Sequence, residues 1–539
     1  MYEETACDES TPVLIVGGGL VGLSAALFLS WRGVSSILVE KHPGTSIHPR
    51  AWGLYPRTLE TYRPLGVADA LLAEGAGFAG HNLNGKVESL AGNEIAVGKV
   101  PPPEDVSDVS PVERILSLSQ DRIEPHILRR ARELGADIRF GTELVGHAQD
   151  ATGVTATVRE GGAERTIRAQ YLIACDGAHS PVRQFLGVQQ YGPGTFRHQV
   201  SIVFGASLAE PLRGRRFAVC QVKNAHVDGI LGHDDSLTQG TLIVTYKPED
   251  GERPEDFTTD RCIELVRAAV GVPDLDVEIR SVLPWEMAAL VAQRFSAGRV
   301  FLAGDAAHVI PPVGGYGANT GIQDVHNLAW KIDAVLAGVA EPALLETYGM
   351  ERQPVAASTT RQAGARLAVR GGFATAEQLA EVLDTLTVTF GYQYRTTAIV
   401  AEDTPPADPF AVNFVEPRAL TGQPGTRAPH LVVDRDGGPV STVDLVERDA
   451  VLFAGPAGGS WAEAAREVAQ KLDIPLDVYQ FGADVRTTGR SWSEGYGVTD
   501  TGAVLVRPDG FVAWRAADAA EDRSAASVIE DALRRIYSR

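Results

Sequence analysis

The sequence predicts a protein of mixed α/β and α+β class, in which a Rossmann-like domain is interrupted by an antiparallel-sheet domain and followed by a smaller αβ domain. Three observations support this expectation. Between Val13 and Glu40, a strand-like run, a glycine turn, an apolar helix and a second strand follow one another, which is the order of a βαβ unit. Short strand-like runs separated by polar loops fill residues 190–285. A Pro- and Gly-rich stretch then precedes a last αβ segment.

The expected domain boundaries follow these changes of pattern along the 539 residues, a length that favours two or three domains. Residues 1–189 form the first part of the Rossmann-like domain, residues 190–285 form the sheet domain, and residues 286–400 resume the first domain and add helices. We interpret residues 401–428 as a linker, because Pro and Gly favour irregular backbone. The order of strands and helices in residues 429–539 resembles a thioredoxin-like domain.

Composition excludes several classes of function. The net charge of −20 argues against binding to nucleic acid or to an anionic membrane, since both need a basic surface. No apolar run approaches the ~20 residues of a membrane span, and the N-terminus lacks the apolar core of a signal peptide. The four cysteines are scattered without a CxxC pair or a metal-ligand spacing, which indicates no metal site and a reducing, cytoplasmic location.

A glycine motif lies between the first strand and the first helix. Gly17, Gly19 and Gly22 form GxGxxG, in which the glycines permit a tight turn, a close approach to a pyrophosphate and close packing of helix on strand. Glu40 ends the second strand, where an acid can bond the ribose hydroxyls of a dinucleotide. These residues predict dinucleotide binding, but by themselves they do not separate FAD from NAD.

Two later motifs resemble a known family. ACDGAHSPVR, from Ala174 to Arg183, resembles the DG motif of class A FAD-dependent aromatic hydroxylases, and Gly298 to Lys331 resembles their GD motif over its whole length. The chain is thus similar to the para-hydroxybenzoate hydroxylase and phenol hydroxylase type. Within that type it looks most like bacterial aromatic polyketide hydroxylases such as aklavinone 11-hydroxylase. Segments near residues 241–262, 391–398 and 502–515 add to the likeness.

The resemblance implies roles for individual residues. Asp305 would bond the FAD ribityl chain, the Pro312 carbonyl would face the substrate, and the backbone N–H groups of Ala318 and Asn319, beside Gly315 and Gly317, would stabilise negative charge on the reduced flavin. Further positions implied to bind FAD or the transient nicotinamide cofactor are Arg50, Gln120, Asp176, His179 and Arg183. Arg183 could equally form a structural ion pair, and His308 is more typical of a packed histidine than of a catalyst.

The substrate is expected between the middle sheet and the flavin. Alternation along the predicted strands, together with nearby apolar and aromatic residues, gives as candidate lining residues Val200, Ile202, Phe204, Cys220, Tyr246, Trp285 and Met287. The same alternation equally describes a sheet packed on a hydrophobic core, so both interpretations stay open here.

The implied reaction is ring hydroxylation of a polycyclic aromatic, polyketide-type substrate with NADPH and O2 through a flavin C4a-hydroperoxide. NADH in place of NADPH, and a monomer or a homodimer, are left open. The sequence also leaves open Baeyer–Villiger insertion or epoxidation on the same fold, a flavin reductase without oxygen insertion, and a non-enzymatic FAD protein. Because no cysteine follows Cys262, the last domain is expected to lack disulfide chemistry, which needs two thiols, and to serve in packing.

Overall fold

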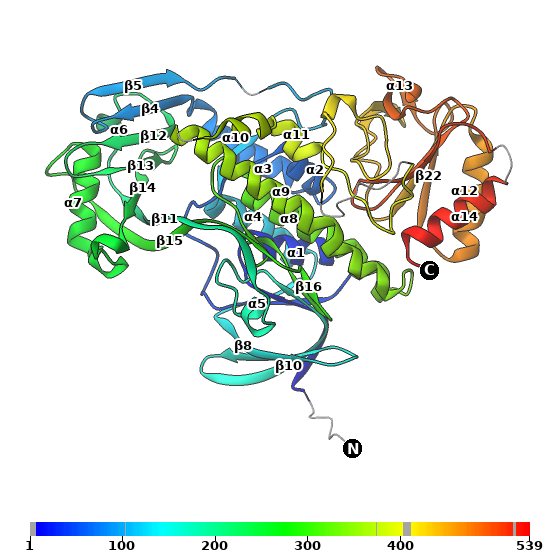
Figure 1. The fold of residues 1–539 in the computed structure, drawn as a ribbon, viewed down its shortest axis with the longest axis horizontal. Helices are drawn as coiled ribbons and strands as arrows, with labels where there is room; N and C mark the ends of the chain where they lie inside the picture. Colours follow the sequence, from blue (N-terminus) through cyan, green and yellow to red (C-terminus); the bar gives the residue numbers. More distant parts are fainter. Residues whose placement is uncertain (1–6, 103, 373, 403–410, 521–523) are drawn as a thin grey trace.

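The computed structural model describes residues 7–102, 104–372, 374–402, 411–520 and 524–539. These residues form five β-sheets with helices packed on and between them, which confirms the predicted mixed class. Figure 1 shows two lobes side by side along the long axis, the sheet domain with α7 on the left and the C-terminal domain on the right, with the Rossmann-like domain between and below them.

The first sheet is largely parallel, as predicted for a Rossmann-like domain, and its central strand β1 pairs in parallel with both β2 and β10. In spatial order its main path is β16 (Ser296–Ala297), β17 (Val300–Leu302), β10 (Ala163–Ala174), β1 (Glu9–Val16), β2 (Ser36–Glu40) and β7 (Asp137–Phe140), with β8 (Thr142–Gln149) and β9 (Val154–Glu160) joined through β10. Strand β17 is separated from β10 by the whole middle domain in sequence, so the Rossmann-like domain does resume after an interruption.

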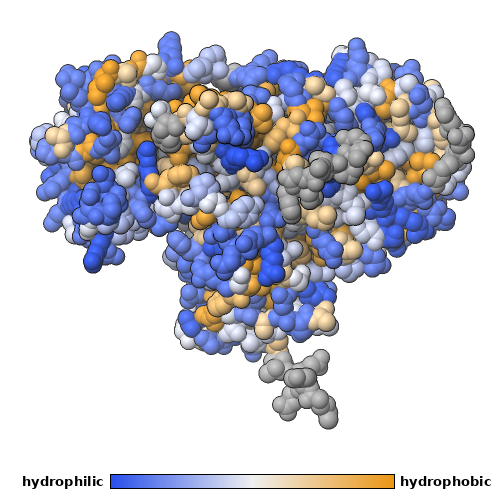
Figure 2. Space-filling view, viewed as in Figure 1, coloured by the Kyte–Doolittle hydropathy of each residue, from blue (hydrophilic) through white to orange (hydrophobic). Residues whose placement is uncertain are grey.

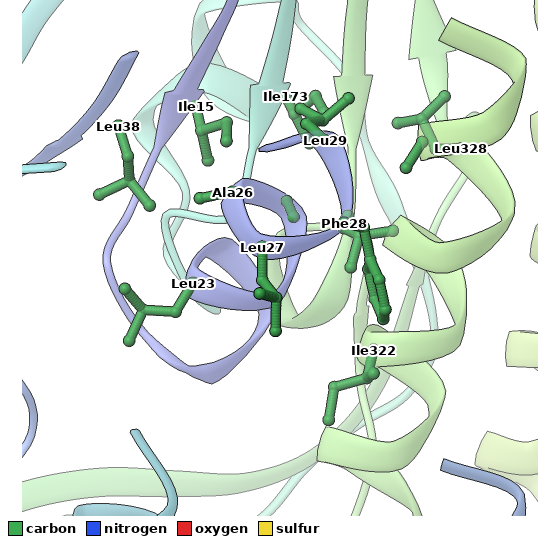
Figure 3. Close-up of a cluster of buried hydrophobic side chains, with 14 of the residues drawn as sticks. Ile15, Leu23, Ala26, Leu27, Phe28, Leu29, Leu38, Ile173, Ile322 and Leu328 are labelled. Atoms are coloured by element: carbon green, nitrogen blue, oxygen red, sulfur yellow. The ribbon is translucent and has the colours of Figure 1, made fainter. Parts of the chain in front are cut away.

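Helix α1 (Leu20–Trp31) fills the space between this sheet and helix α8 (Tyr316–Leu336). In Figure 3, Ile15, Leu38 and Ile173 project from three strands toward Ala26 and its neighbours on α1, while Ile322 and Leu328 approach from α8. The helix has buried residues on all sides, as expected for a helix inside a core. The glycine turn before α1 and the loop before α8 are thereby held at fixed places.

The second sheet runs in spatial order β18 (His308–Val309), β15 (Glu278–Ala292), β11 (Gln190–Gly205), β14 (Gln239–Tyr246), β13 (Asp228–His233), β12 (Phe217–Lys223), β4 (Leu83–Val87) and β5 (Glu94–Lys99). Two of its strands therefore come from residues 83–99, which we assigned to the Rossmann-like part, and β15 continues past residue 285. Pairing of β4 with β12 joins residues more than 130 positions apart. Local patterns in the sequence do not predict which distant strand pairs with which. Helix α7 (Thr259–Val270) packs on one face of the sheet.

Further helices surround the two sheets. They are α2 (Pro56–Tyr62), α3 (Ala68–Gly75), α4 (Gln120–Glu133), α5 (Pro181–Phe185), α6 (Ala209–Leu212), α9 (Glu346–Gly371), α10 (Ala376–Glu381) and α11 (Thr385–Phe390). β3 (Trp52–Leu54) and β6 (Leu116–Ser119) pair in a short antiparallel ribbon. The 26-residue α9 packs against α8 and β15 and so joins both sheets.

The C-terminal domain contains a four-stranded sheet in the order β22 (Leu476–Gln480), β21 (Ala450–Ala454), β24 (Ala503–Val506) and β25 (Val512–Ala516). The remaining elements are β19 (Val432–Arg435), β20 (Gly438–Ser441), β23 (Arg486–Thr487), α12 (Gly459–Leu472), α13 (Trp492–Tyr496) and α14 (Ala525–Ile536). Trp461 and Trp514 are in edge contact in a hydrophobic cluster that also contains Trp330 of α8, which fits the packing role predicted for this domain.

The stretch interpreted as a linker, residues 401–428, is packed in much of its described part. The Gly425 N–H donates to Val512 and the Tyr394 N–H donates to Gly425. The Arg427 side chain is buried and bonds Glu60 in the first domain. Residues 403–410 lie outside the described part. Composition alone predicted irregular backbone correctly, but it did not predict that this backbone is fixed by contacts on both sides.

Hydrophilic residues cover most of the face seen in Figure 2, with hydrophobic residues scattered among them. Within the part of the chain that the structure describes, no helix combines the length and the apolar character needed to cross a membrane. The same residues contain no grouping of His, Cys, Asp and Glu that could hold a metal ion.

Candidate active site

The glycine turn after β1 has the geometry of a dinucleotide-binding turn. Gly17 has a φ of +104°, and a Cβ there would lie 2.3 Å from the Cys175 carbonyl oxygen. A Cβ on Gly22 would lie 1.9 Å from the Gly17 carbonyl oxygen, so the third glycine lets α1 approach the turn. Gly19 is the N-cap of α1 without a side-chain cap, which leaves the first N–H groups of that helix available to phosphate oxygens.

Glu40 lies beside this turn, at the end of β2. Its Oε2 accepts a hydrogen bond of 2.6 Å from the Gly18 N–H, and its Oε1 accepts one of 2.8 Å from the His42 N–H. The carboxylate is therefore held next to the turn, where sequence reasoning placed an acid for the ribose hydroxyls.

Gln120 begins α4 and is buried. Its amide Nε2 donates to Glu124 Oε1 at 2.6 Å, and the Ser46 N–H donates to Glu124 Oε2 at 2.7 Å. Burial raises the pKa of the Glu124 carboxyl, while the nearby charge of Arg50 opposes the shift. Sequence reasoning missed Glu124, although its place one helical turn after Gln120 was a signal. It links the loop that carries the exposed Arg50 to the helix that carries Gln120.

The DG motif contains two residues with structural roles. Asp176 Oδ1 accepts from the Ser180 hydroxyl at 2.5 Å and Oδ2 accepts from the Val182 N–H at 3.0 Å, so Asp176 fixes the turn before α5. The Arg183 guanidinium donates to the Ala306 and Ala178 carbonyl oxygens at 3.0 and 2.8 Å. Arg183 therefore ties the DG motif to the GD motif, through carbonyl groups and not through an ion pair. His179 is exposed, and its predicted cofactor contact stays a prediction.

Asp305 follows β17 at the start of the GD motif. Its side chain is exposed although its neighbours on either side in the chain are buried. Surrounding protein atoms displace water from part of the carboxyl and raise its pKa, an effect opposed by the charges of His308 and Arg50. An exposed acceptor in such a recess is suited to bonding a polyol hydroxyl, as the ribityl role requires.

The loop from Pro312 leads into α8 through two glycines with positive φ, Gly314 at +94° and Gly315 at +68°. The Pro312 carbonyl accepts the Gly315 N–H at 3.1 Å, so it closes this turn, and its contact with substrate stays a prediction. Gly315 is the N-cap of α8. The N–H groups of Gly317 and Ala318 consequently have no partner within the helix and are available to an electron-rich acceptor.

Asn319 has a different role from the one that we predicted. Helix α8 begins at Tyr316, so the Asn319 N–H is the first that bonds within the helix and is not free for the flavin. Its side chain instead joins two segments. The carboxamide oxygen accepts from the Tyr55 N–H at 2.8 Å and from the Thr58 hydroxyl at 2.7 Å, and its nitrogen donates to the Gly315 carbonyl at 2.9 Å. Asn319 thus positions the start of α8 against the segment before α2.

His308 is packed, as the sequence favoured. It is fully buried, and its Nε2 lies 2.6 Å from Asp324 Oδ2. Burial opposes ionisation of Asp324, but His308 and Arg352 outweigh it and lower the pKa of this carboxyl. This group holds α8 and α9 together beneath the GD motif.

Five of the predicted substrate-lining residues belong to a hydrophobic core. These are Val200, Ile202, Phe204, Cys220 and Tyr246, which pack in one cluster with residues of α7. Burial of Phe204 and Cys220 is complete, so these side chains face α7 and not the flavin side of the sheet. The prediction was wrong for them because the apolar positions on β11 mark the face covered by α7.

The opposite face of the same sheet is the candidate substrate surface, which we call the open face. Trp285 is on this face, since its indole Nε1 donates to Ser201 at 2.9 Å, and Met287 follows it at period two. The face is defined by Gln199, Ser201, Ile230, Ile243, Ser281, Leu283 and Trp285, which alternate with core residues or pair with each other across strands. It contacts the segment that carries Arg50, because Ser281 Oγ lies 2.8 Å from His48 Nε2.

Trp52 lies over the same region. A Cβ on Gly232 of β13 would be 3.6 Å from the Trp52 ring, and 48% of the Trp52 surface is exposed. Ile230, two residues along β13, is also exposed. Sequence reasoning missed Trp52 and Ile230 because the open face mixes polar and apolar residues and so carries no clean alternation.

The arrangement fits FAD. Only glycine fits at positions 17 and 22, an acid lies beside the turn, an exposed carboxylate follows β17, and a helix N-terminus preceded by positive-φ glycines points its free N–H groups away from α8. The glycine turn would hold the pyrophosphate and the acid beside it the adenosine ribose, while the carboxylate after β17 would hold the ribityl chain and the helix start the flavin ring.

Replacement of Asp305 by alanine should weaken FAD binding about tenfold or more, because it removes a charge-assisted hydrogen bond of roughly 1.5–3 kcal/mol. Fluorescence titration of the deflavinated protein with FAD measures the change. Asp305→Asn keeps a neutral acceptor, so its Kd for FAD should lie between those of the wild-type protein and of Asp305→Ala. An unchanged Kd in the alanine variant would remove Asp305 from the FAD site.

Comparisons with known proteins agree with this geometry. A family model described as an FAD binding domain matches residues 10–363, and a model of the C-terminal region of aromatic-ring hydroxylases matches residues 421–539. The chain is 44% identical to a 4-methyl-5-nitrocatechol 5-monooxygenase from Burkholderia sp, covering 99% of both chains. It is 42% identical to a tetracenomycin A2 monooxygenase-dioxygenase from Streptomyces glaucescens, covering 98% of this chain and 97% of that protein.

Among solved structures, the fold matches aklavinone-11 hydroxylase in a ternary complex with FAD and aklavinone. The TM-score is 0.86 at 38% sequence identity, and the match covers 99% of this chain and all of the other. The monooxygenase PieE with FAD and substrate matches with a TM-score of 0.83 at 32% identity, over 99% of this chain and 100% of that one.

Proposed function

The chain belongs to the FAD-dependent aromatic-ring hydroxylases, and we propose that its substrate is a fused-ring phenol or quinone of the aromatic polyketide type. Membership of this family establishes the general activity: the protein binds FAD and is a monooxygenase that hydroxylates aromatic compounds. The substrate, the reductant and the roles of individual residues are the proposed part.

The observation that supports a fused-ring substrate most strongly is the composition of the open face. It presents exposed Trp52 and Ile230 together with neutral polar groups such as Ser201 and Ser281. Flat aromatic compounds bind well to such a surface, because ring faces pack on indole and aliphatic groups while a few hydroxyls fix orientation. The nearby guanidinium of Arg122 is already paired with Glu74 and Asp235, so it is not a ready anchor for a small carboxylate.

Bound FAD supplies the activated oxygen, since no side chain can provide it. The chain positions the ring to be hydroxylated between the open face and the start of α8, and excludes water from that space. The free N–H of Ala318 would stabilise negative charge that develops near the helix N-terminus. Asn319 would act as a positioning residue, since it holds that N-terminus against Tyr55 and Thr58.

The reductant is proposed to be NADPH, which would bind transiently. The chain has two GxGxxG spacings. Gly17 to Gly22 lies between a strand and a helix and is assigned to FAD, whereas Gly75 to Gly80 follows helix α3 and does not have that context. Comparing the rate of flavin reduction with NADPH and with NADH tests the choice, and faster reduction by NADH would reverse it.

A single-ring catechol is the second candidate substrate, because one relative of 44% identity over nearly the full chain is a nitrocatechol monooxygenase. Product mass spectrometry with two matched panels, tetracyclic phenols and substituted catechols, separates the candidates. We expect oxygenated products and strong stimulation of NADPH oxidation only with the polycyclic panel. Turnover of catechols with no response to tetracyclic phenols would contradict the proposal and leave the family assignment in place.

A substitution on each face of the sheet tests the location of the substrate. Ile230→Trp fills the open face and should raise KM at least tenfold without changing FAD content. Val200→Ala lies on the α7 face and should lower the free energy of unfolding by about 2 kcal/mol with an unchanged KM. Steady-state kinetics and thermal unfolding of both variants measure this. If Val200→Ala changes KM and Ile230→Trp does not, the two faces have been assigned the wrong way round.

A further inference from the structure

A cavity of about 30 Å³ lies behind the start of α8, where α2, α8, α9 and the end of α11 meet. The side chains that line it include Arg57, Gln323, Arg352, Thr359 and Tyr392. One buried water needs roughly 10–15 Å³, so the cavity has room for more than one water or for a monatomic ion. It is too small for a phosphate or sulfate group.

Three polar groups around this cavity lack a partner among the residues that the structure describes. They are Arg57 Nε, Gln323 Nε2 and the Tyr392 hydroxyl, on side chains whose residues are only 4%, 7% and 4% exposed. Leaving a buried donor unsatisfied destabilises the folded state. Two of the three groups are N–H donors and the third can donate, so all of them call for an acceptor in the cavity.

The charges around the cavity favour an anion over water. Glu60 bonds both Arg57, at 3.2 Å, and Arg427, at 2.5 Å, so this buried group of two cations and one carboxylate has a charge of +1. Arg352 shares its carboxylate, Asp324, with His308. An uncompensated positive charge away from water is costly, and an anion beside Arg57 would compensate it.

The neighbouring buried ions do not supply that compensation. Lys331 and Arg507 pair with Glu351, and Arg507 also pairs with Asp509. This second group has two cations and two carboxylates and is neutral in itself.

We propose that the cavity binds a chloride ion, held by Arg57, Gln323 and Tyr392. The ion would complete the hydrogen bonds of α2 and α8 just below Asn319, and would thereby hold the helix start that faces the flavin. The site is separate from the open face, and the proposal does not depend on which aromatic compound is the substrate.

Bromide replaces chloride and is visible by anomalous scattering, so crystals of the FAD-bound protein grown in sodium bromide provide the test. We expect one anomalous peak inside the cavity, lost in Gln323→Leu and in Tyr392→Phe. Tyr479→Phe removes a phenol hydroxyl from β22, outside the cavity, and should keep the peak. Two water molecules without anomalous signal would overturn the proposal, as would a peak of equal height in all variants, which would indicate an adventitious ion only.

A solution measurement gives an independent readout if one variant fails to fold. Thermal unfolding of the holoenzyme is followed in sodium chloride and in sodium gluconate at equal ionic strength. Chloride should raise Tm by about 1–2 °C, because it binds the folded state alone. The difference should disappear in Gln323→Leu or Tyr392→Phe and persist in Tyr479→Phe. Equal Tm values of the wild-type protein in both salts, at chloride concentrations up to the bromide concentration of the crystals, would contradict the proposed site.

Discussion

Gly22→Ala should yield protein that retains almost no FAD. A Cβ at this position would lie 1.9 Å from the Gly17 carbonyl oxygen and 3.4 Å from the Cys175 side chain. Neither α1 nor the turn can move away easily, because α1 is packed between the sheet and α8. The clash must therefore displace the turn whose free N–H groups we propose bind the pyrophosphate. The flavin absorbance relative to protein absorbance after purification measures the loss.

Gly364→Ala is the matched control for that substitution. Gly364 is also a helical glycine, in α9, and nothing lies within 4 Å of the position of its Cβ. It should retain FAD fully and gain up to ~1 kcal/mol of stability from better helix propensity. Full FAD occupancy in Gly22→Ala would show that the glycine turn does not bind the cofactor.

Glu351→Gln should lower the free energy of unfolding by about 3–5 kcal/mol, because it leaves two buried cations without their main carboxylate. Glu351 bonds Lys331 at 2.7 Å and Arg507 at 2.6 and 2.8 Å, and all three side chains are fully buried. Arg507 comes from the C-terminal domain, whereas Lys331 and Glu351 belong to α8 and α9. The substitution should therefore also loosen the attachment of that domain.

Thermal unfolding midpoints and the half-life at a fixed temperature measure the effect. Glu463→Gln on α12 is the control, since Glu463 is exposed and its loss should change stability by no more than ~0.5 kcal/mol. Similar midpoints for the two variants would show that the buried ion group contributes little to stability.

The surroundings of Glu351 also determine how the stability of the protein changes in acid. Burial by itself would raise the pKa of Glu351, but Arg507 and Lys331 outweigh it and hold the pKa far below its usual range. A carboxyl with a lowered pKa in the folded state stabilises the protein above the unfolded-state pKa of about 4.3. That contribution is lost as the pH falls below this value. Glu351→Gln should therefore lose less of its free energy of unfolding than the wild-type protein over the same pH range.

Local patterns in the sequence were sufficient to predict the Rossmann-like unit. Strand, glycine turn, helix and Glu40 are all neighbours in the chain, so their geometry follows from spacing alone. The resemblance also implied a role for Asp305, which stays a prediction, and a helix from Asn319, which in the structure begins three residues earlier, at Tyr316. For Asn319 the resemblance implied a free backbone N–H, whereas in the structure the side chain makes the contacts. The exact residue at which a helix begins decides which N–H groups stay free.

Long-range contacts account for what the sequence did not predict. Alternation on β11 separates two faces, but only the position of α7 shows that Val200 and Phe204 lie on the covered one. The strands β4 and β5 join a sheet whose other strands lie far along the chain. Arg427 lies in a Pro- and Gly-rich stretch whose composition predicts a linker. Its ion pair with Glu60 nevertheless fixes that stretch to the first domain.

Incorporation of oxygen from labelled dioxygen distinguishes an aromatic monooxygenase from a flavin reductase. The holoenzyme is supplied with NADPH, a polycyclic phenol that it turns over and 18O2, and the product mass is measured. We expect an aromatic product that carries one 18O atom from O2 for each NADPH consumed in productive turnover. A reduced product, or NADPH oxidation that only yields hydrogen peroxide with every aromatic compound tested, would contradict assignment of the chain as an aromatic monooxygenase.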